Sequence, residues 1–123
     1  MVQYRYVYWF FYIFYLDILG GEPFQQHRDN TLLNLLKRIK QEYPEKPIWV
    51  WTGYNLETVL ECNSIVHKYN RELLKYIDVL VDGKFVEELK DLRLMYRGSS
   101  NQRVIDIKKT LESNSICLLD NNI

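Results

Sequence analysis

Cysteine is scarce in this sequence of 123 residues, which contains only Cys62 and Cys117. Metal centres and redox motifs use closely spaced cysteines, whereas small secreted scaffolds use a dense, even-numbered set. Two distant cysteines match neither pattern, and His27 and His67 have no carboxylate or cysteine at the spacing of metal ligands. We therefore expect no metal site at these residues and two reduced thiols in a cytoplasmic protein.

Net charge and long apolar runs are lacking too. Sixteen Lys and Arg balance sixteen Asp and Glu, so the basic surface typical of a nucleic-acid-binding domain is not expected. Residues 1–16 are rich in aromatic side chains, but a membrane-spanning helix needs about 20 mostly apolar residues and tyrosine prefers the membrane interface. No small-residue cleavage site follows this stretch, which disfavours a signal peptide. We expect neither a nucleic acid nor a membrane as a partner.

The length allows one domain with a real core, but it falls below the roughly 200 residues of a closed α/β barrel. The sequence shows no internal repeat and no flexible linker. We expect a single α/β domain over residues 17–123, preceded by the aromatic-rich segment 1–16, whose origin we do not assign.

The first half of the chain predicts a strand followed by a helix. Aromatic and β-branched residues over 7–19 favour extended structure, which Gly20 and Gly21 end. Asp29 or Asn30 is a plausible cap for a helix with a leucine-rich face, and Pro44 ends that helix.

The second half continues the alternation. The nearly continuous apolar run 48–52 is typical of a central parallel strand with helices on both faces. Asn55 is a plausible cap for a helix to about residue 76, with a possible break at 62–64, and 77–81 is the third strand. This order predicts a parallel sheet with right-handed crossovers. Beyond it we expect a short helix over 86–94, a polar loop over 97–102, and strands over 103–107 and 116–119.

The turn Gly20-Gly21-Glu22-Pro23 follows the first predicted strand, at the end where open α/β sheets bind ligands. The glycines permit close approach of a ligand to the main chain, and Pro23 stiffens the turn. Glu22 offers an anionic acceptor suited to an ammonium group. The set fits an amino-acid-like ligand better than a phosphate. A plain turn with a solvent-facing glutamate is the alternative.

The end of the second predicted strand supplies further candidates. Thr52, Gly53 and Tyr54 are placed to line a pocket at the same edge of the sheet. Trp49 and Trp51 alternate with smaller residues, which favours packing of both indoles between the sheet and its helices.

Two later motifs remain open to two interpretations each. Asp82-Gly83 ends the third predicted strand and is either an ordinary turn or part of the site. The donor-rich stretch 97–103 suits either an internally hydrogen-bonded loop or a surface that recognises a partner protein.

Four segments carry a family resemblance when they are taken in order: GGEP at 20–23, IWVWTGY at 48–54, VLVDGKF at 79–85 and YRGSSNQRVID at 96–106. Together they resemble the C-terminal part of the anaerobic ribonucleoside-triphosphate reductase activating proteins, which are radical S-adenosylmethionine (SAM) activases. The resemblance covers about residues 17–119.

The resemblance implies a partial TIM-like barrel that lacks its first βα units. In radical SAM proteins a GGEP-like motif contacts the methionyl amino group of SAM, which assigns residues 20–23 to the cofactor, with Thr52 and Gly53 beside them. It also implies a [4Fe-4S] cluster as a second cofactor and the anaerobic ribonucleoside-triphosphate reductase as the partner, on which the family generates a glycyl radical.

One departure from the family controls the expected activity. In the family, three cysteines in a C-x3-C-x2-C motif upstream of the GGEP segment hold the cluster, but no cysteine precedes Gly20 here. We therefore assign no catalytic residue and no metal ligand, and we expect the chain as written to be inactive. A truncated or frameshifted gene and a genuine short homologue both explain the departure. The alternative functions are a non-catalytic reductase-binding module and a non-functional gene fragment.

Overall fold

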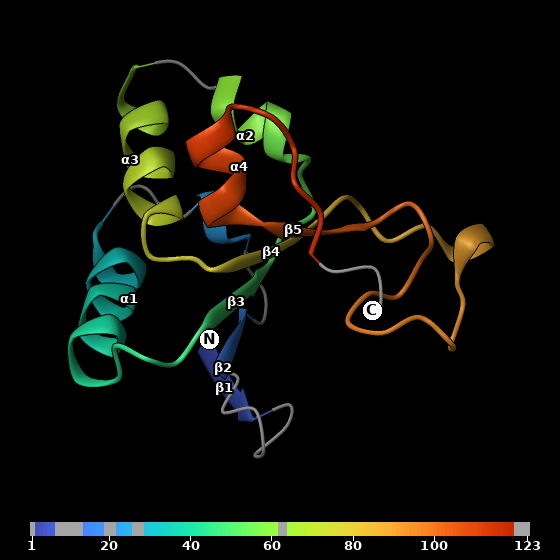
Figure 1. Ribbon diagram of the computed structural model, residues 1–123, viewed down its shortest axis with the longest axis horizontal. Coiled ribbons are helices and arrows are strands. Elements are labelled where there is room, and N and C mark those ends of the chain that lie inside the picture. Colours follow the sequence, from blue (N-terminus) through green and yellow to red (C-terminus); the bar gives the residue numbers. More distant parts are fainter. Residues whose placement is uncertain (1, 7–13, 19–21, 26–28, 62–63, 120–123) are drawn as a thin grey trace.

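The computed structural model describes residues 2–6, 14–18, 22–25, 29–61 and 64–119. The fold is mixed α/β and contains a five-stranded sheet whose strands lie in sequence order (Figure 1). These strands are β1 (Val2–Tyr6), β2 (Phe14–Ile18), β3 (Ile48–Trp51), β4 (Val79–Asp82) and β5 (Arg103–Asp106). None of the helices in the described ranges is long and apolar enough to cross a membrane.

The central part of the sheet is parallel, as the alternating pattern predicts. β2 pairs with β3, and β3 pairs with β4, both in parallel. The connection from β2 to β3 contains α1 (Thr31–Glu42), and the connection from β3 to β4 contains α2 (Leu56–Glu61) and α3 (Ser64–Leu74). Residues 14–18 of the strand expected over 7–19 form β2, while its residues 7–13 and 19 lie outside the described residues.

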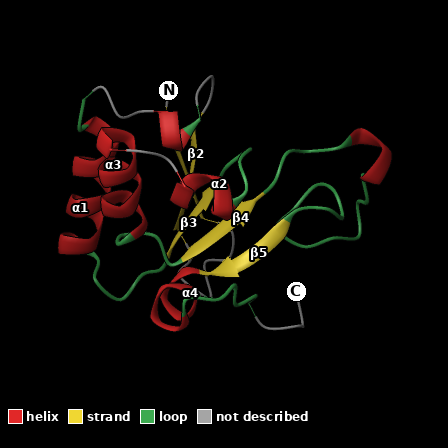
Figure 2. Ribbon diagram, turned by 90° about the horizontal axis from the view of Figure 1, so that it is seen from above, coloured by secondary structure: helices red, strands yellow, loops and turns green. Residues whose placement is uncertain are grey.

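Both outer strands are antiparallel to their neighbours, so the prediction of an all-parallel sheet is wrong at the edges. β5 follows β4 through residues 83–102, which contain only the short 3-10 helix η2 (Glu87–Leu89) instead of the helix expected over 86–94. An antiparallel neighbour needs no crossover helix, and this explains the changed strand direction. We call residues 83–102 the excursion; Figures 1 and 2 show it projecting away from the helices.

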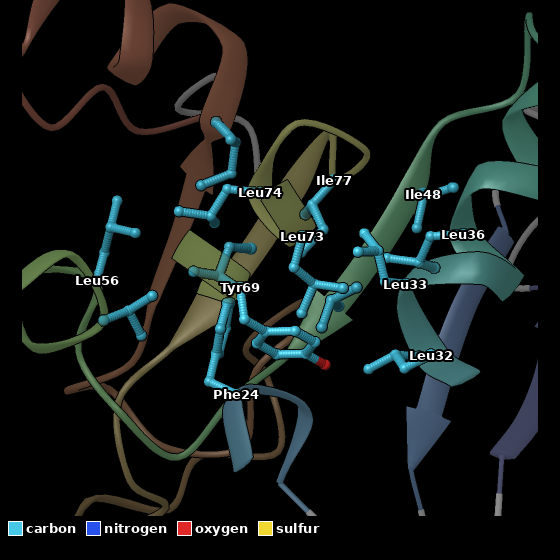
Figure 3. Packing of buried hydrophobic residues seen from close by; sticks show 14 of the residues in the cluster. Phe24, Leu32, Leu33, Leu36, Ile48, Leu56, Tyr69, Leu73, Leu74 and Ile77 are labelled. Atoms are coloured by element: carbon cyan, nitrogen blue, oxygen red, sulfur yellow. The ribbon is translucent and has the colours of Figure 1, made fainter. Parts of the chain in front are cut away.

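The four α-helices in the described part of the chain pack on one face of the sheet, where alternate strand residues form the main core. Ile48, Val50, Leu80 and Ile105 point to this face and are at most 2% exposed. Figure 3 shows Leu36 of α1 beside Ile48. The main core therefore lies between the sheet and a single layer of helices.

The opposite face is covered by loop residues, so the prediction of helices on both faces is wrong. Trp49 is 4% exposed and clusters with Val79, Val81 and Val104. The Tyr96 ring lies 4.6 Å from the Trp49 ring, centroid to centroid, and the main-chain oxygen of Tyr96 accepts a 2.8 Å hydrogen bond from Trp51 Nε1. The indoles therefore pack against Tyr96 of the excursion rather than against helices.

The helix α4 (Ile107–Ser113) is a feature that the sequence pattern did not predict. The Asp106 side chain caps it by accepting a 3.0 Å hydrogen bond from the Lys109 N–H, and Asn114 ends it in the left-handed conformation at φ 57°. The strand expected over 116–119 is reduced to a single bridge between Ile105 and Leu118.

The other predicted caps are partly confirmed. Asp29, not Asn30, accepts the hydrogen bond from the Thr31 N–H at the start of α1, at 3.0 Å. At the start of α2 the Leu56 N–H donates to Asp82 Oδ2 at 2.8 Å, so a side chain from β4 takes the place expected for Asn55.

Candidate functional site

The candidate site lies at one edge of the sheet because β2, β3 and β4 run in the same direction and end there. Two main-chain hydrogen bonds join the loop after β3 to β4 and to the residue that follows β4. The Thr52 N–H donates to the Val81 oxygen at 3.0 Å, and the Gly83 N–H donates to the Tyr54 oxygen at 2.9 Å. These bonds hold the edge in one arrangement.

Glu22 joins the turn at Pro23 to the loop after β3. Its Oε1 atom accepts hydrogen bonds from the Thr52 hydroxyl and the Gly53 N–H, both at 2.6 Å. Its Oε2 atom accepts from the Phe24 N–H at 2.9 Å. The structure thus brings together Glu22, Pro23, Thr52 and Gly53, four of the six residues predicted to contact a cofactor; Gly20 and Gly21 lie outside the described residues.

The Glu22 carboxylate is therefore oriented by protein donors, and the residue is half-buried. Gly53 does not need its glycine for backbone reasons, since it has no positive φ. A Cβ atom there would lie 3.7 Å from Glu22 Oε1, an ordinary contact.

The turn at Glu22 and Pro23 is anchored to α3. Pro23 and Phe24 are buried, and the Tyr69 hydroxyl of α3 donates to the Pro23 oxygen at 3.1 Å. Figure 3 shows the Tyr69 and Phe24 rings next to each other. Burial, with smaller contributions from Asp29 and Glu22, raises the pKa of Tyr69 to about 12, so it remains a donor at neutral pH. Sequence reasoning missed this anchor because it joins residues far apart in the chain.

A second polar cluster stands beside the site. Asp82 is fully buried and receives two hydrogen bonds from the Arg103 guanidinium, from Nε at 3.0 Å and from Nη2 at 2.5 Å. Arg103 also contacts the half-exposed Glu57, with Nη2 to Oε1 at 2.6 Å. Hydrogen bonds to Asp82 and then to Glu57 raise the pKa of Arg103, and the Arg103 hydrogen bond lowers the pKa of Glu57. Asp82 is thus part of a buried ion pair.

The donor-rich stretch 97–103 forms an internally hydrogen-bonded loop, which was one of its two interpretations. Gln102 Oε1 accepts from the N–H groups of Gly98 at 2.9 Å and Ser99 at 3.2 Å, and Gln102 Nε2 donates to the Gly83 oxygen at 2.9 Å. Arg97 Nη1 donates to the Gln102 oxygen at 2.5 Å. Arg97 and Arg103 therefore hold the fold together.

The residues of this chain do not fit a [4Fe-4S] cluster by themselves. Its two cysteines are fewer than the three thiolates that such a cluster takes in the family. Cys62 lies outside the described residues, and Cys117 is half-buried, with its N–H donating to the Thr110 hydroxyl at 2.9 Å. Within the described ranges, no three His, Cys, Asp or Glu side chains come together as a metal site.

The family model described as "4Fe-4S single cluster domain" matches residues 10–105, which is most of the chain. This chain belongs to that family. Three relatives share the name anaerobic ribonucleoside-triphosphate reductase-activating protein. The Haemophilus influenzae protein is 46% identical over 87 residues, covering 71% of this chain and 52% of the relative. The Escherichia coli K12 protein is 45% identical over 89 residues, covering 72% and 53%.

The third relative, from Enterobacteria phage T4, is 39% identical over 93 residues, covering 76% of this chain and 53% of the relative. The resemblance to the activating proteins is confirmed by these matches. The chain spans about half the length of the curated relatives it matches. No solved structure matches it.

Proposed function

We propose that this chain corresponds to the C-terminal part of an activating protein for anaerobic ribonucleoside-triphosphate reductase, and that the Glu22 turn contributes to SAM binding. The observation that carries the proposal is the convergence of Glu22, Thr52 and Gly53, because residues far apart in the sequence meet at the sheet edge where α/β folds bind ligands. The identity to the named activating proteins supports the same conclusion.

In this proposal the chain's own residues bind and orient. Neutral donors from Thr52, Gly53 and Phe24 fix the direction of the Glu22 carboxylate. A fixed carboxylate forms charge-assisted hydrogen bonds with an ammonium group, which matches the methionyl amino group of SAM. Gly20 and Gly21 complete the proposed contact set with Pro23. The two cysteines of this chain do not suffice to hold a cluster, so its residues are assigned binding and orientation only.

The proposed architecture is a partial radical SAM barrel. The three parallel strands with helices on one face match an arc of such a barrel, and the face that bears Trp49 corresponds to its interior. The proposed family domain begins inside the segment 1–16, because the family match starts at residue 10 and β2 starts at Phe14. β1 precedes that match and pairs along its whole length with β2.

A ligand titration followed by NMR tests the SAM contact. SAM is compared with 5′-methylthioadenosine, which lacks the methionyl amino acid but keeps the nucleoside. We expect SAM alone to shift the amide signals of Phe24 and Gly53, because both N–H groups donate to Glu22. Glu22→Gln removes the charge, so SAM should bind about ten- to a hundredfold more weakly, with 5′-methylthioadenosine unchanged. Identical responses to the two ligands, or no response near Glu22, would refute the contact.

A second candidate function, docking on the reductase, is favoured by the surface of the excursion. Leu92 is 89% exposed, and Phe85, Leu89 and Met95 are each at least 40% exposed. These apolar side chains stand on a segment whose main chain is fixed by the Gln102 hydrogen bonds. A preorganised surface with exposed apolar side chains suits partner recognition.

Co-purification with the reductase tests this docking. Leu92→Ser should reduce capture of the reductase while leaving the thermal unfolding of the free chain unchanged, since the side chain is exposed. Arg97 and Arg103 are unsuitable probes because their substitution disturbs the fold. Undiminished capture by both Leu92→Ser and Phe85→Ser would reject the excursion as the docking surface.

A further inference from the structure

A cavity of about 240 Å³ lies between the Glu22 turn and the helices α2 and α3. Among the described residues, Phe24 and Tyr54 supply aromatic walls, Val59 and Val66 supply aliphatic ones, and the polar members are Gln25, Thr58 and Asn70. The cavity lies against the buried side of the turn, where Phe24 packs beside Tyr69 of α3 (Figure 3). Glu22 does not line it, although Phe24 contributes its side chain to the cavity and its N–H to the Glu22 carboxylate.

Asn70 is the unusual member of this lining. It is only 1% exposed, and its Nδ2 atom donates to the Val59 oxygen at 2.9 Å. Its Oδ1 atom is buried without a hydrogen-bond partner, the one such side-chain atom in the described part of the chain. Because a buried amide oxygen without a donor is costly, a native structure needs a reason to keep one. A donor supplied by an occupant of the cavity is such a reason.

The size and walls of the cavity define the occupant. A water molecule takes about 30 Å³ in the liquid, so the space greatly exceeds that of one bridging water. Aromatic and aliphatic walls with few polar groups are typical of sites for small organic ligands. We propose that this cavity binds a small, largely apolar molecule that carries one N–H or O–H donor, and that the donor bonds to Asn70 Oδ1. This proposal does not depend on SAM binding at Glu22.

A pair of matched probes tests the proposal on the full 123-residue chain. Indole carries one N–H donor, and 1-methylindole has the same ring system without it. NMR titrations should show both compounds shifting the methyl signals of Val59 and Val66, with indole also shifting the Asn70 side-chain amide. We expect indole to bind about three- to tenfold more tightly, the worth of one net hydrogen bond. Equal affinities, or no shifts at these residues, would overturn the proposal, as for a cavity that holds only water.

A pair of variants locates the binding. Val66→Phe fills the cavity from α3 and should abolish the indole-induced shift at Val59. Lys68→Ala, at an exposed position of the same helix, should leave both affinities unchanged. Far-UV circular dichroism reports whether Val66→Phe still folds. If it does not, the comparison of the two indoles on the unmodified chain decides the question. Undiminished indole binding by a folded Val66→Phe would place the ligand elsewhere and refute the proposal.

Discussion

Removing the Arg103 guanidinium should destabilise the fold far more than removing its exposed partner. Arg103→Met keeps an apolar stem of similar length but leaves the Asp82 carboxylate, which is fully buried, without its two guanidinium hydrogen bonds. The Leu56 N–H would remain as a donor to it. Breaking a buried ion pair by removing one partner typically costs about 3–5 kcal/mol. Because the Arg103 side chain is 30% exposed, we place the expected loss at the lower end, about 3 kcal/mol.

The matched control is Glu57→Gln. The Glu57 side chain is 55% exposed, so solvent screens its pairing with Arg103 and its loss should cost less than about 1 kcal/mol. Arg103→Lys tests the geometry, because it keeps the charge but loses the planar guanidinium. Its loss of stability should fall between those of Arg103→Met and Glu57→Gln.

Urea unfolding, followed by circular dichroism and fluorescence, measures these differences. Coincident transitions from the two probes would justify two-state analysis. A loss of about 3 kcal/mol corresponds to a fall in Tm on the order of 10 °C for a chain of this size. The reasoning is refuted if Glu57→Gln is as damaging as Arg103→Met, because burial would then not determine the cost.

Two further predictions concern the stability of the core and its acid dependence. Burial raises the pKa of Asp78, but hydrogen bonds from Lys40, the Ile48 N–H and Lys108 outweigh it and lower the pKa below its ordinary value. The stability that this lowering contributes is present above about pH 4 and is lost as pH falls through the lower folded-state pKa. The stability difference between the unmodified chain and Asp78→Asn should therefore shrink below pH 4 in urea titrations, and a constant difference would contradict this. Leu36→Ala removes a fully buried side chain and should cost about 2–5 kcal/mol, whereas Leu92→Ala, at an 89% exposed position, should change stability by less than about 0.5 kcal/mol.

The sequence predicted the parallel centre of the fold because its signals are local. Alternation of apolar runs with leucine-rich segments indicates βαβ units wherever the chain repeats them, and β2, α1, β3 and β4 follow that pattern. The direction of β5 depends instead on the path of the excursion, which carries no periodic signal. α4 did have a local signal, Asp106 three residues before Lys109 with an apolar face behind it, but its seven residues are too few for a strong period.

The candidate site was predicted in its residue types but not in its hydrogen bonds. Glu22, Thr52 and Gly53 were expected at one edge because parallel strands end together. Their direct contact depends on how the loops fold, and the anchoring of Pro23 by Tyr69 joins elements that share no sequence pattern. The resemblance to the activating proteins supplied the ligand class, which geometry alone does not define.

A pair of glycines separates the demands of the fold from those of the proposed site. Gly83 has φ +96°, a conformation that L-residues rarely adopt, while a Cβ there would meet only ordinary contacts, the nearest at 3.5 Å from Gln102 Cα. Gly83→Ala should therefore cost about 1–2 kcal/mol through backbone strain. Gly53 lacks a positive φ, so Gly53→Ala should leave stability nearly unchanged.

The same pair should respond to SAM in the opposite order. The Cβ of Gly53→Ala would lie beside Glu22 Oε1, where the proposed ammonium group binds, so SAM affinity should fall although the fold is intact. Gly83→Ala leaves the Glu22 contacts in place, so its remaining folded population should bind SAM normally. Urea unfolding and the amide titration measure the two effects separately. If Gly53→Ala binds SAM as the unmodified chain does, the glycine after β3 is required by neither the fold nor the ligand. Gly53 would then be rejected as a contact of SAM.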